Sequence, residues 1–526
     1  MVATAFPAAS EAALWAFRAG GSAIDAAVAA AWALAVCEPG ASGLGGQTVA
    51  LVRLASGRTL AVDGHSRAPA AASKLSVRRV EQRLGYRACT VPTTPAVLAA
   101  LQRRHCRLPL ATLLEPAIRL AAGGYRLTPL QHRQLRWCEA GLLATPAASR
   151  FRQRSGRLYA AGDVFRQPRL ADALRRIARH DTDDFYRGAI AQAIAGDMRA
   201  RGGLLDEADL AAVREPDERE PVTVGYRGRR VLTVPPLGGG IELLLALKLL
   251  ERLGPDGAPD AAASWSARLA DVVHTTFAER ERQPAHPDDW APALGDRLLG
   301  DERAVELAGR LSAARPVAAG AGREEPGETT HLCTADAEGN VVSLTQSIQS
   351  LFGAKVANDR YGFLYNNYLT TCPRRPHRYR LDGRCRARSN AAPALVLAPE
   401  GGSMRPALVL GAAGSRRIVS SMLHVVTGVL DRRLELGDAL AGPRVHARLS
   451  GRVWVERPAA TAELSRELAQ RFVAVDIRPR HSYDMGAVQA IEIQADGSMV
   501  GAADPRRDGT ALALDRGAPT CSGRTG

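Results

Sequence analysis

Residues 329–348 most constrain how this chain can fold. The sequences THLCTAD and VVSLTQSI flank the turn-forming cluster AEGN at 337–340, and on both sides apolar and polar residues alternate. Such alternation around a Gly-Asn turn is typical of a β-hairpin. A polar segment that contains glycine and proline, 311–328, comes just before it. The pattern therefore predicts a strand that begins at a threonine, directly after a flexible surface linker.

The remaining periodicity predicts helices mainly before this hairpin and strands mainly after it. Helical patterns cover 8–37, 94–122, 169–201, 241–253 and about 417–430. Strand patterns cover 228–236, 394–397, 407–410 and 453–456, with further hairpins at 48–65 and 487–504. The glycine triplet 238–240 lacks the Lys-Ser/Thr of a phosphate loop and predicts a helix-entry turn. The chain could form two domains, or one layered α/β structure with strands from both halves.

The charge of the chain leaves one alternative function open. The formal net charge is +15, and only Lys74, Lys248 and Lys355 among the basic residues are lysines. A basic balance can indicate a nucleic-acid partner. Here the arginines are spread along the chain and join no recognisable binding module, so solvated surface arginine is the preferred interpretation.

The sequence also lacks the usual marks of membranes, export, metals and cofactors. No apolar run approaches the roughly 20 residues that span a bilayer. The N-terminal residues show amphipathic helical periodicity and no signal-peptide pattern, so a soluble, cytoplasmic protein is expected. The eight cysteines have no CxxC or metal-like spacing, which predicts reduced thiols and no metal site. No motif implies an organic cofactor.

Thr329 is the remaining candidate for chemistry. A threonine hydroxyl is a weak nucleophile that needs a base within hydrogen-bond reach. Its own α-amine, which titrates near ~8, can be that base if the peptide bond between Glu328 and Thr329 is cut. Most threonines in strands are structural. The residues alone therefore leave a catalytic and a structural interpretation open.

The segment 329–353 reads T-T-H-L-x-x-x-D-x-x-G-N-V-V-S-L-T-x-S-I-x-x-x-F-G. It resembles the start of the small subunit of the γ-glutamyltranspeptidase family. Further matching segments follow the family order at 20–46, 113–128, 202–213, 226–240 and 501–509. The resemblance covers nearly the whole chain. It implies an N-terminal nucleophile hydrolase with a four-layer αββα fold, made as one precursor and self-cleaved before the threonine.

The resemblance also implies roles for individual catalytic residues. Thr329 matches the nucleophile of the family. Ser347 matches a threonine whose hydroxyl orients that nucleophile, and serine keeps the hydroxyl. Gly414 and Ser415 match a Gly-Gly pair whose backbone N–H groups hold the oxyanion, which Ser415 can also do if its backbone angles permit.

On the substrate side the chain departs from the family pattern. Gln349 matches an asparagine that helps to bind substrate, and it keeps a polar amide. The family holds the α-carboxylate of a γ-glutamyl group with an arginine, in a stretch that reads VDGHSRAP here. His65 stands at the place of that arginine, and Arg67 follows two residues later. Arg67 or an arginine from 374–388 could substitute for it.

The residues that hold the α-amino group in the family are also replaced. Tyr368 and Thr371 stand where the family has acidic or amide residues, and the usual Ser-Ser pair reads Ser389-Asn390. An aromatic ring and a hydroxyl cannot neutralise an ammonium group as a carboxylate does. The resemblance therefore keeps the catalytic half of the site and loses the clamp for an amino acid.

These observations predict a hydrolase or acyltransferase cut into residues 1–328 and 329–526, which associate as a heterodimer. Three functions remain open. The first is hydrolysis or transfer of a γ-glutamyl-type amide. The second is a specialised biosynthetic reaction without glutathione, such as cleavage of a carbon–carbon bond beside a keto group in an antibiotic pathway. The third is a non-catalytic relative or a basic nucleic-acid-binding protein.

Overall fold

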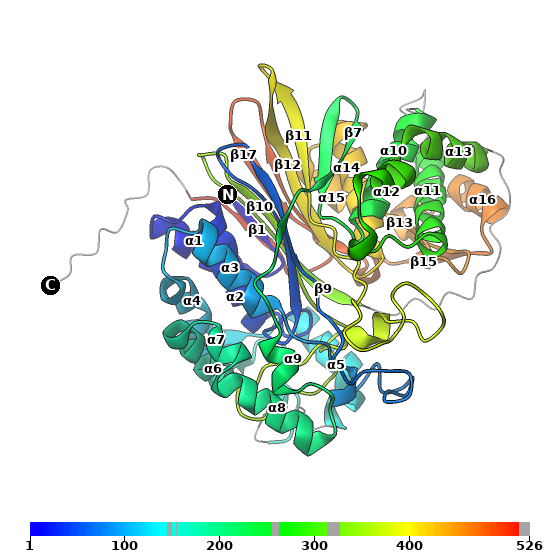
Figure 1. Cartoon of the computed structure of the whole chain (residues 1–526). Helices are drawn as coiled ribbons and strands as arrows, with labels where there is room; N and C mark the ends of the chain where they lie inside the picture. Colours follow the sequence, from blue (N-terminus) through cyan, green and yellow to red (C-terminus); the bar gives the residue numbers. More distant parts are fainter. Residues whose placement is uncertain (145–149, 154, 255–261, 313–326, 515–526) are drawn as a thin grey trace.

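Two β-sheets lie face to face in the computed structural model, and helices cover the outer face of each sheet (Figure 1). The structure describes residues 1–144, 150–153, 155–254, 262–312 and 327–514. Within these ranges no helix has the length and apolar character needed to cross a bilayer. The four-layer αββα architecture that the resemblance implied is confirmed.

The first sheet combines strands from both ends of the chain. Its seven strands are, in order, β18 (Thr510–Leu512), β1 (Val2–Thr4), β9 (Glu328–Ala335), β10 (Val341–Gln349), β2 (Gln47–Arg53), β3 (Thr59–Gly64) and β6 (Glu218–Arg219). The hairpins predicted at 329–348 and 48–65 are β9–β10 and β2–β3. β2 belongs to the predicted product 1–328 and β10 to the predicted product 329–526. Because β10 pairs with β2, the sheet is continuous only when both of these parts are present.

The second sheet has six strands. Its order is β17 (Met499–Ala503), β16 (Ala487–Ile493), β12 (Ser403–Ala413), β11 (Ala394–Glu400), β8 (Arg229–Thr233) and β7 (Val222–Tyr226). Two small sheets complete the strands: β13 (Val445–Ala447), β14 (Arg452–Glu456) and β15 (Ala474–Arg478) form one, and β4 (Tyr125–Arg126) and β5 (Val164–Phe165) form the other. The pairing of β8 with β11 again joins the two parts of the chain.

The two-residue period of β9 decides which side chains enter the space between the sheets. Cys333 belongs to the apolar cluster between the sheets. Leu332 belongs to the core on the helical side, where Thr334 Oγ1 donates to the carbonyl of Ala23 at 2.7 Å. Thr329 and His331 share the face of Cys333, and both therefore point toward the second sheet.

His331 is a structural residue between the sheets. Its Nδ1 lies 2.9 Å from Thr345 Oγ1, and its Nε2 lies 3.3 Å from Cys333 Sγ. Burial lowers the pKa of His331 to about 3, so the ring is neutral at physiological pH. The ring packs directly against the backbone of Gly411 in β12, where a Cβ atom would come within 2.2 Å of it.

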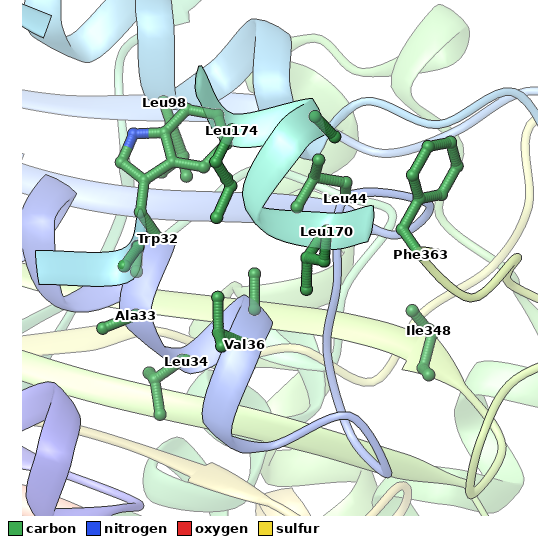
Figure 2. Packing of buried hydrophobic residues seen from close by; sticks show 14 of the residues in the cluster. Trp32, Ala33, Leu34, Val36, Leu44, Leu98, Leu170, Leu174, Ile348 and Phe363 are labelled. Carbon is green, nitrogen blue, oxygen red and sulfur yellow. The ribbon is translucent and has the colours of Figure 1, made fainter. Parts of the chain in front are cut away.

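The helices on the outer side of the first sheet share one apolar core, in which some helices contact the strands and others pack on those helices (Figure 1). They are α1 (Pro7–Arg18), α2 (Ala23–Cys37), α3 (Thr94–His105), α4 (Leu110–Gly123), α5 (Pro129–Leu143), α6 (Pro168–His180), α7 (Asp183–Tyr186), α8 (Ala189–Arg201) and α9 (Glu207–Ala211). Every residue of α2 is buried, and Trp32 and Val36 pack with residues of neighbouring elements such as Leu98 and Leu174 (Figure 2). A helix that is apolar all round in this way belongs in the core.

The helical pattern predicted over 8–37 forms two helices instead of one. Gly20 adopts a φ of +88° after α1, and Ser22 caps α2 through a capping box with Asp25. A left-handed glycine followed by an N-cap serine ends one helix and starts the next. The break lets α2 enter the core while α1 stays beside β1 and β18.

The second helical layer covers the six-stranded sheet. It contains α10 (Gly240–Leu253), α11 (Ala262–Arg282), α12 (Pro292–Leu299), α13 (Asp301–Ser312), α14 (Arg417–Leu430), α15 (Leu436–Ala441) and α16 (Ala462–Arg471). The predicted helix-entry turn at 238–240 leads into α10 as expected. The predicted linker 311–328 lies mainly outside the described residues, which leave out 313–326.

We expect Gly411→Ala to destabilise the fold, because the new methyl group would overlap the His331 ring. Overpacking of this kind costs about 1–3 kcal/mol. The midpoint of thermal unfolding should fall by several degrees. Gly437→Ala is the matched control: a Cβ atom added at this exposed position of α15 meets no heavy atom within 4 Å, so the midpoint should hold or rise. Equal midpoints for the two variants would contradict the role of Gly411.

Candidate active site

Strand register gathers the predicted catalytic residues at one end of the two sheets. In the first sheet Gln349 pairs with Glu328 and Ser347 pairs with Gln47, so the start of β9, the end of β10 and the start of β2 lie together. In the second sheet β12 ends at Ala413, directly before Gly414 and Ser415. The sheets therefore bring the threonine and the glycine-serine pair to the same end of the molecule.

Ser347 connects the hydroxyl of Thr329 to the peptide bond before it. Thr329 Oγ1 donates to Ser347 Oγ at 3.3 Å, and Ser347 Oγ donates to the carbonyl oxygen of Glu328 at 2.6 Å. The Gln349 N–H donates to the same Ser347 oxygen at 2.9 Å. The hydroxyl of Ser347 thus links Thr329 Oγ1 to the carbonyl group of the peptide bond before it, within a buried site.

Gly414 and Ser415 both have positive φ angles, in the turn between β12 and α14. Their φ angles are +123° and +57°. The carbonyl groups of both residues accept the first hydrogen bonds at the start of α14, from Arg417 and Ile418. The N-terminus of a helix carries partial positive charge, which favours a developing oxyanion. Ser415 thus adopts a left-handed backbone conformation, which has a steric cost for a residue other than glycine.

The segment before Thr329 lies against this turn. A Cβ atom added to Gly327 would stand 2.9 Å from both Cβ and Oγ of Ser415, and 3.3 Å from the Gln349 carbonyl oxygen. The uncut chain thus fills the space beside Ser415.

Ser389 and Asn390 approach the site from the start of β11. The Asn390 Nδ2 donates to Ser415 Oγ at 3.3 Å, and the Ser389 Oγ accepts from the Ala391 N–H at 3.0 Å. Arg280 in α11 holds both residues, since its Nη1 donates to Asn390 Oδ1 and its Nη2 to the Ser389 carbonyl, each at 2.6 Å.

Glu281, next to Arg280, holds the arginines that flank these segments. Its carboxylate lies 3.1 Å from a guanidinium nitrogen of Arg388 and 3.1 Å from one of Arg416. Burial alone would raise the pKa of Glu281, but the guanidinium groups of Arg388, Arg416 and Arg280 outweigh it and lower the pKa to about 2. Nothing in the sequence pattern singled out Arg280 or Glu281, because they lie within an amphipathic helix far from the site in sequence.

Tyr368 enters the site through the 3-10 turn Tyr368–Thr371. Burial raises the pKa of its phenol to about 12, and contacts of that hydroxyl with Ser347, Ser389 and Gln47 partly offset the effect. Thr371 lies farther along the turn, where its hydroxyl donates to the Tyr368 carbonyl at 2.9 Å. The structure therefore brings Tyr368 together with Ser347 and Ser389, and uses the Thr371 side chain within the turn itself.

His65 and Arg67 lie beside a neighbouring cavity of about 420 Å³, with Arg384 and Arg386 also in its wall. The His65 Nδ1 stands 2.7 Å from Asp63 Oδ1, and the Arg67 Nη1 donates to the Arg384 carbonyl at 3.2 Å. The wall of this cavity contains neither Thr329 nor Tyr368. His65 and Arg67 thus lie together, in the wall of a cavity that does not include Thr329.

The groups gathered around Thr329 are hydroxyl groups, backbone amides and buried arginines. Across the described residues, no group of three or more His, Cys, Asp or Glu side chains could hold a metal ion. The chemistry that these side chains can supply is proton transfer, nucleophilic attack and stabilisation of an oxyanion.

The fold and the geometry around Thr329 define an N-terminal nucleophile hydrolase or transferase. The chain belongs to the gamma-glutamyltranspeptidase family, whose model matches residues 9–514.

Similar proteins include acylases as well as glutathione hydrolases. The chain is 32% identical over 535 residues to the acylase ACY 1 proenzyme of Pseudomonas sp. (strain V22), covering 98% of this chain and 94% of that protein. It is 29% identical over 520 residues to the glutathione hydrolase proenzyme of Escherichia coli (strain K12), covering 93% and 87%. The crystal structure of a cephalosporin acylase from Bacillus halodurans superposes with a TM-score of 0.86 at 29% identity, over 98% of this chain and 95% of that one.

Because the chain belongs to a family of enzymes, an enzyme is favoured over the alternative of a nucleic-acid-binding protein. The expectation of a cytoplasmic location stays a prediction.

The ion pairs of Glu281 predict how the stability of the site region depends on pH. A carboxylate with a lowered pKa in the folded state stabilises the protein above its unfolded pKa, and this contribution disappears as the pH falls through the folded value. We therefore expect Glu281 to contribute to a fall in the thermal midpoint between about pH 4.5 and 2. Glu281→Gln should have a lower midpoint at pH 7 and a shallower decrease over this range. Glu115→Gln, at a half-buried position where the carboxylate pairs only loosely with Arg119, should follow the wild type; a Glu281→Gln curve parallel to it would refute the prediction.

Proposed function

We propose that this chain is a precursor cut between Glu328 and Thr329, and that Thr329 then serves as the N-terminal nucleophile of an acylase-type hydrolase or acyltransferase. The observation that carries the proposal is the Ser347 hydroxyl, which bridges Thr329 Oγ1 and the Glu328 carbonyl oxygen. The relatives named above as proenzymes support it.

In the proposed cleavage, Thr329 Oγ1 attacks the carbonyl carbon of Glu328. Ser347 accepts the hydrogen bond of the attacking hydroxyl and donates one to the carbonyl oxygen, so it can pass the proton to the tetrahedral intermediate. The proton reaches the Thr329 nitrogen as the C–N bond breaks and an ester forms. Water then hydrolyses the ester, which leaves an α-carboxylate on Glu328 and a free amine on Thr329.

In turnover the free amine of Thr329 would act as the base for its own hydroxyl. The N–H groups of Gly414 and Ser415 at the start of α14 would stabilise the oxyanion. Water or an amine would release the acyl group, and the proposed steps use no metal or organic cofactor. Gly327 and Glu328 must leave first, because they occupy the space beside Ser415 and Ser347 that a substrate needs.

The two products, 1–328 and 329–526, would remain a heterodimer. Both sheets need strands from both products, as the pairings of β10 with β2 and of β11 with β8 illustrate. Separation would expose the apolar clusters that the sheets and helices share.

For the substrate we propose an acyl group without an α-ammonium group. Tyr368 places a neutral phenol beside Ser347 and Ser389, and burial opposes its ionisation. A phenol cannot provide the charge that would hold an ammonium group. The acylases among the relatives support this choice. Cleavage of a carbon–carbon bond beside a keto group, and a role in antibiotic biosynthesis, stay predictions.

The nucleophile can be tested by gel electrophoresis under denaturing conditions. The purified wild type should give two chains, and Thr329→Ala a single chain of 55.9 kDa. Thr329→Ser should still cut itself. Ser347→Ala should slow cutting about 10²-fold, the usual cost of losing a donor to a developing oxyanion. Ser343→Ala is the matched control, because Ser343 lies on the same face of β10 and donates to the Leu410 carbonyl instead. A Thr329→Ala protein that is cut before residue 329 would refute the proposal.

The donor can be tested with two anilides of the same chain length, γ-glutamyl anilide and glutaryl anilide, which differ in the α-amino group. The wild type should favour the glutaryl compound in kcat/KM. Tyr368→Asp should shift the ratio toward γ-glutamyl by about tenfold, which corresponds to ~1.4 kcal/mol. Tyr368→Phe keeps the ring without adding charge and should leave the ratio unchanged. Rapid turnover of γ-glutamyl anilide by the wild type would rule out the proposal that the clamp for the amino acid is lost.

A further inference from the structure

A buried arginine joins the two residues of the proposed cleavage site. The Arg507 Nη1 donates to the Thr329 carbonyl oxygen at 3.2 Å, and its Nη2 lies 2.7 Å from Glu328 Oε2. Its guanidinium group lies 4.7 Å from the centre of the Tyr483 ring. Burial alone would lower the pKa of Arg507, but Glu328, Tyr483 and Glu38 outweigh it, so the group is charged.

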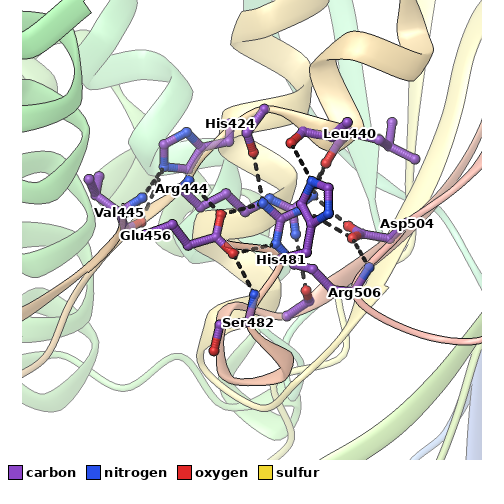
Figure 3. Close-up of polar contacts among 12 residues, drawn as sticks. His424, Leu440, Arg444, Val445, Glu456, His481, Ser482, Asp504 and Arg506 are labelled. Carbon is purple, nitrogen blue, oxygen red and sulfur yellow. Dashed lines mark hydrogen bonds and ion pairs between the residues drawn. The ribbon is translucent and has the colours of Figure 1, made fainter. Parts of the chain in front are cut away.

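The backbone of Arg507 is anchored by the chain segment beside it, because its N–H donates to the Asp504 carbonyl at 3.2 Å. Asp504 and Arg506 belong to a buried network of ion pairs with Arg444 and Glu456 (Figure 3). The Arg444 Nη2 lies 2.5 Å from Asp504 Oδ2, and the Arg506 Nε donates to Glu456 Oε1 at 2.8 Å. None of these contacts uses the cleavage site. Cleavage therefore leaves Arg507 in place.

A second carboxyl group, that of Glu38, interacts electrostatically with the same guanidinium group. Glu38 lies at the C-terminal cap of α2 and is buried. Among the described residues, one oxygen of each carboxyl group, Glu38 Oε2 and Glu328 Oε2, is buried without a hydrogen-bond partner, and so are the Nε and Nη2 atoms of Arg507. The guanidinium group therefore keeps unused donors, and both carboxyl groups keep an unused acceptor.

One arginine cannot neutralise two carboxylates in this buried space. Burial raises the pKa of Glu38 to about 8; Arg507 and the Thr330 hydroxyl oppose this rise, while Glu328 and Asp508 add to it. In the uncut chain Glu38 is therefore mostly protonated at pH 7, and Arg507 has Glu328 as its counter-ion.

We propose that cleavage transfers Arg507 from the Glu328 carboxylate to the Glu38 carboxylate, and that the Glu38–Arg507 pair then positions Thr329 through its carbonyl group. This inference rests on the proposed cleavage at Glu328–Thr329. A substrate acyl group must take the place of the Glu328 carbonyl, so Glu328 leaves and removes its side chain from Arg507. A buried guanidinium group without a counter-ion is costly. Glu38 releases one proton to water and becomes that counter-ion, so the buried charge stays balanced before and after cleavage.

The test compares Glu38→Gln in the uncut and the cut protein. Glutamine resembles the protonated acid, so in a Thr329→Ala precursor the thermal midpoint should change by no more than about one degree. In the cut enzyme the same substitution leaves Arg507 without a counter-ion. We expect the midpoint of the cut enzyme to fall by several degrees, and kcat to fall about tenfold or more with KM nearly unchanged, because Thr329 loses its position. Glu38→Asp should restore part of kcat.

Glu11→Gln, at an exposed position of α1, is the matched control and should leave both proteins unchanged. The inference is overturned if Glu38→Gln affects the precursor and the cut enzyme equally, or if the cut variant keeps wild-type kcat. A failure of the proposed cleavage gives a different result, since the wild type would then remain a single chain on the gel.

Discussion

The ladder between β9 and β10 carries Glu328, Thr329 and Ser347 to one end of the seven-stranded sheet, opposite the turn that joins the two strands. The register shift between Gln346 and Gln349 lies just where the Ser347 hydroxyl reaches the Glu328 carbonyl. A bulge of this kind re-aims side chains at a strand end. The hydrogen bonds of Ser347 with Thr329 and with the Glu328 carbonyl depend on this pairing. The second sheet supplies the turn at Gly414–Ser415, which lies against the same segment.

Arginine has two roles in this chain, and the expectation of solvated surface arginine accounts for only one of them. Many arginines form exposed ion pairs that contribute little to stability. Arg444, Arg506 and Arg507 are buried, and their guanidinium groups tie separate segments to one another. The planar group with five donors suits such links better than lysine does. Hydrogen bonds and ion pairs of arginine also order the walls of the site. Arg280 fixes the Ser389–Asn390 segment, and Glu281 fixes two further arginines.

The substrate side of the site departs from a γ-glutamyl clamp in two separate places. Tyr368, which stands where the family pattern predicts an acidic or amide residue, is a buried phenol in contact with Ser347. His65, at the place of the family arginine, pairs with Asp63 beside the neighbouring cavity. Burial would raise the pKa of Asp63. Its interactions with His65 and Arg386 outweigh this effect and lower the pKa to about 2. Arg386 thus already has a carboxylate partner inside the protein.

The family, the hairpins and the position of the candidate nucleophile could be predicted from the sequence, because alternation, turn residues and motif spacing are local properties of the chain. Ser347, Gly414 and Tyr368 were candidates through their places in the family pattern. The folded structure was needed to show that Gly20 divides the first helical region, that His331 is a neutral packing residue, and that Arg67 lies at a separate cavity. Arg507, Glu38, Arg280 and Glu281 carry no local signal, since a buried ion pair joins residues hundreds of positions apart. Their roles depend on burial and charge balance, which exist only once the two sheets have packed together.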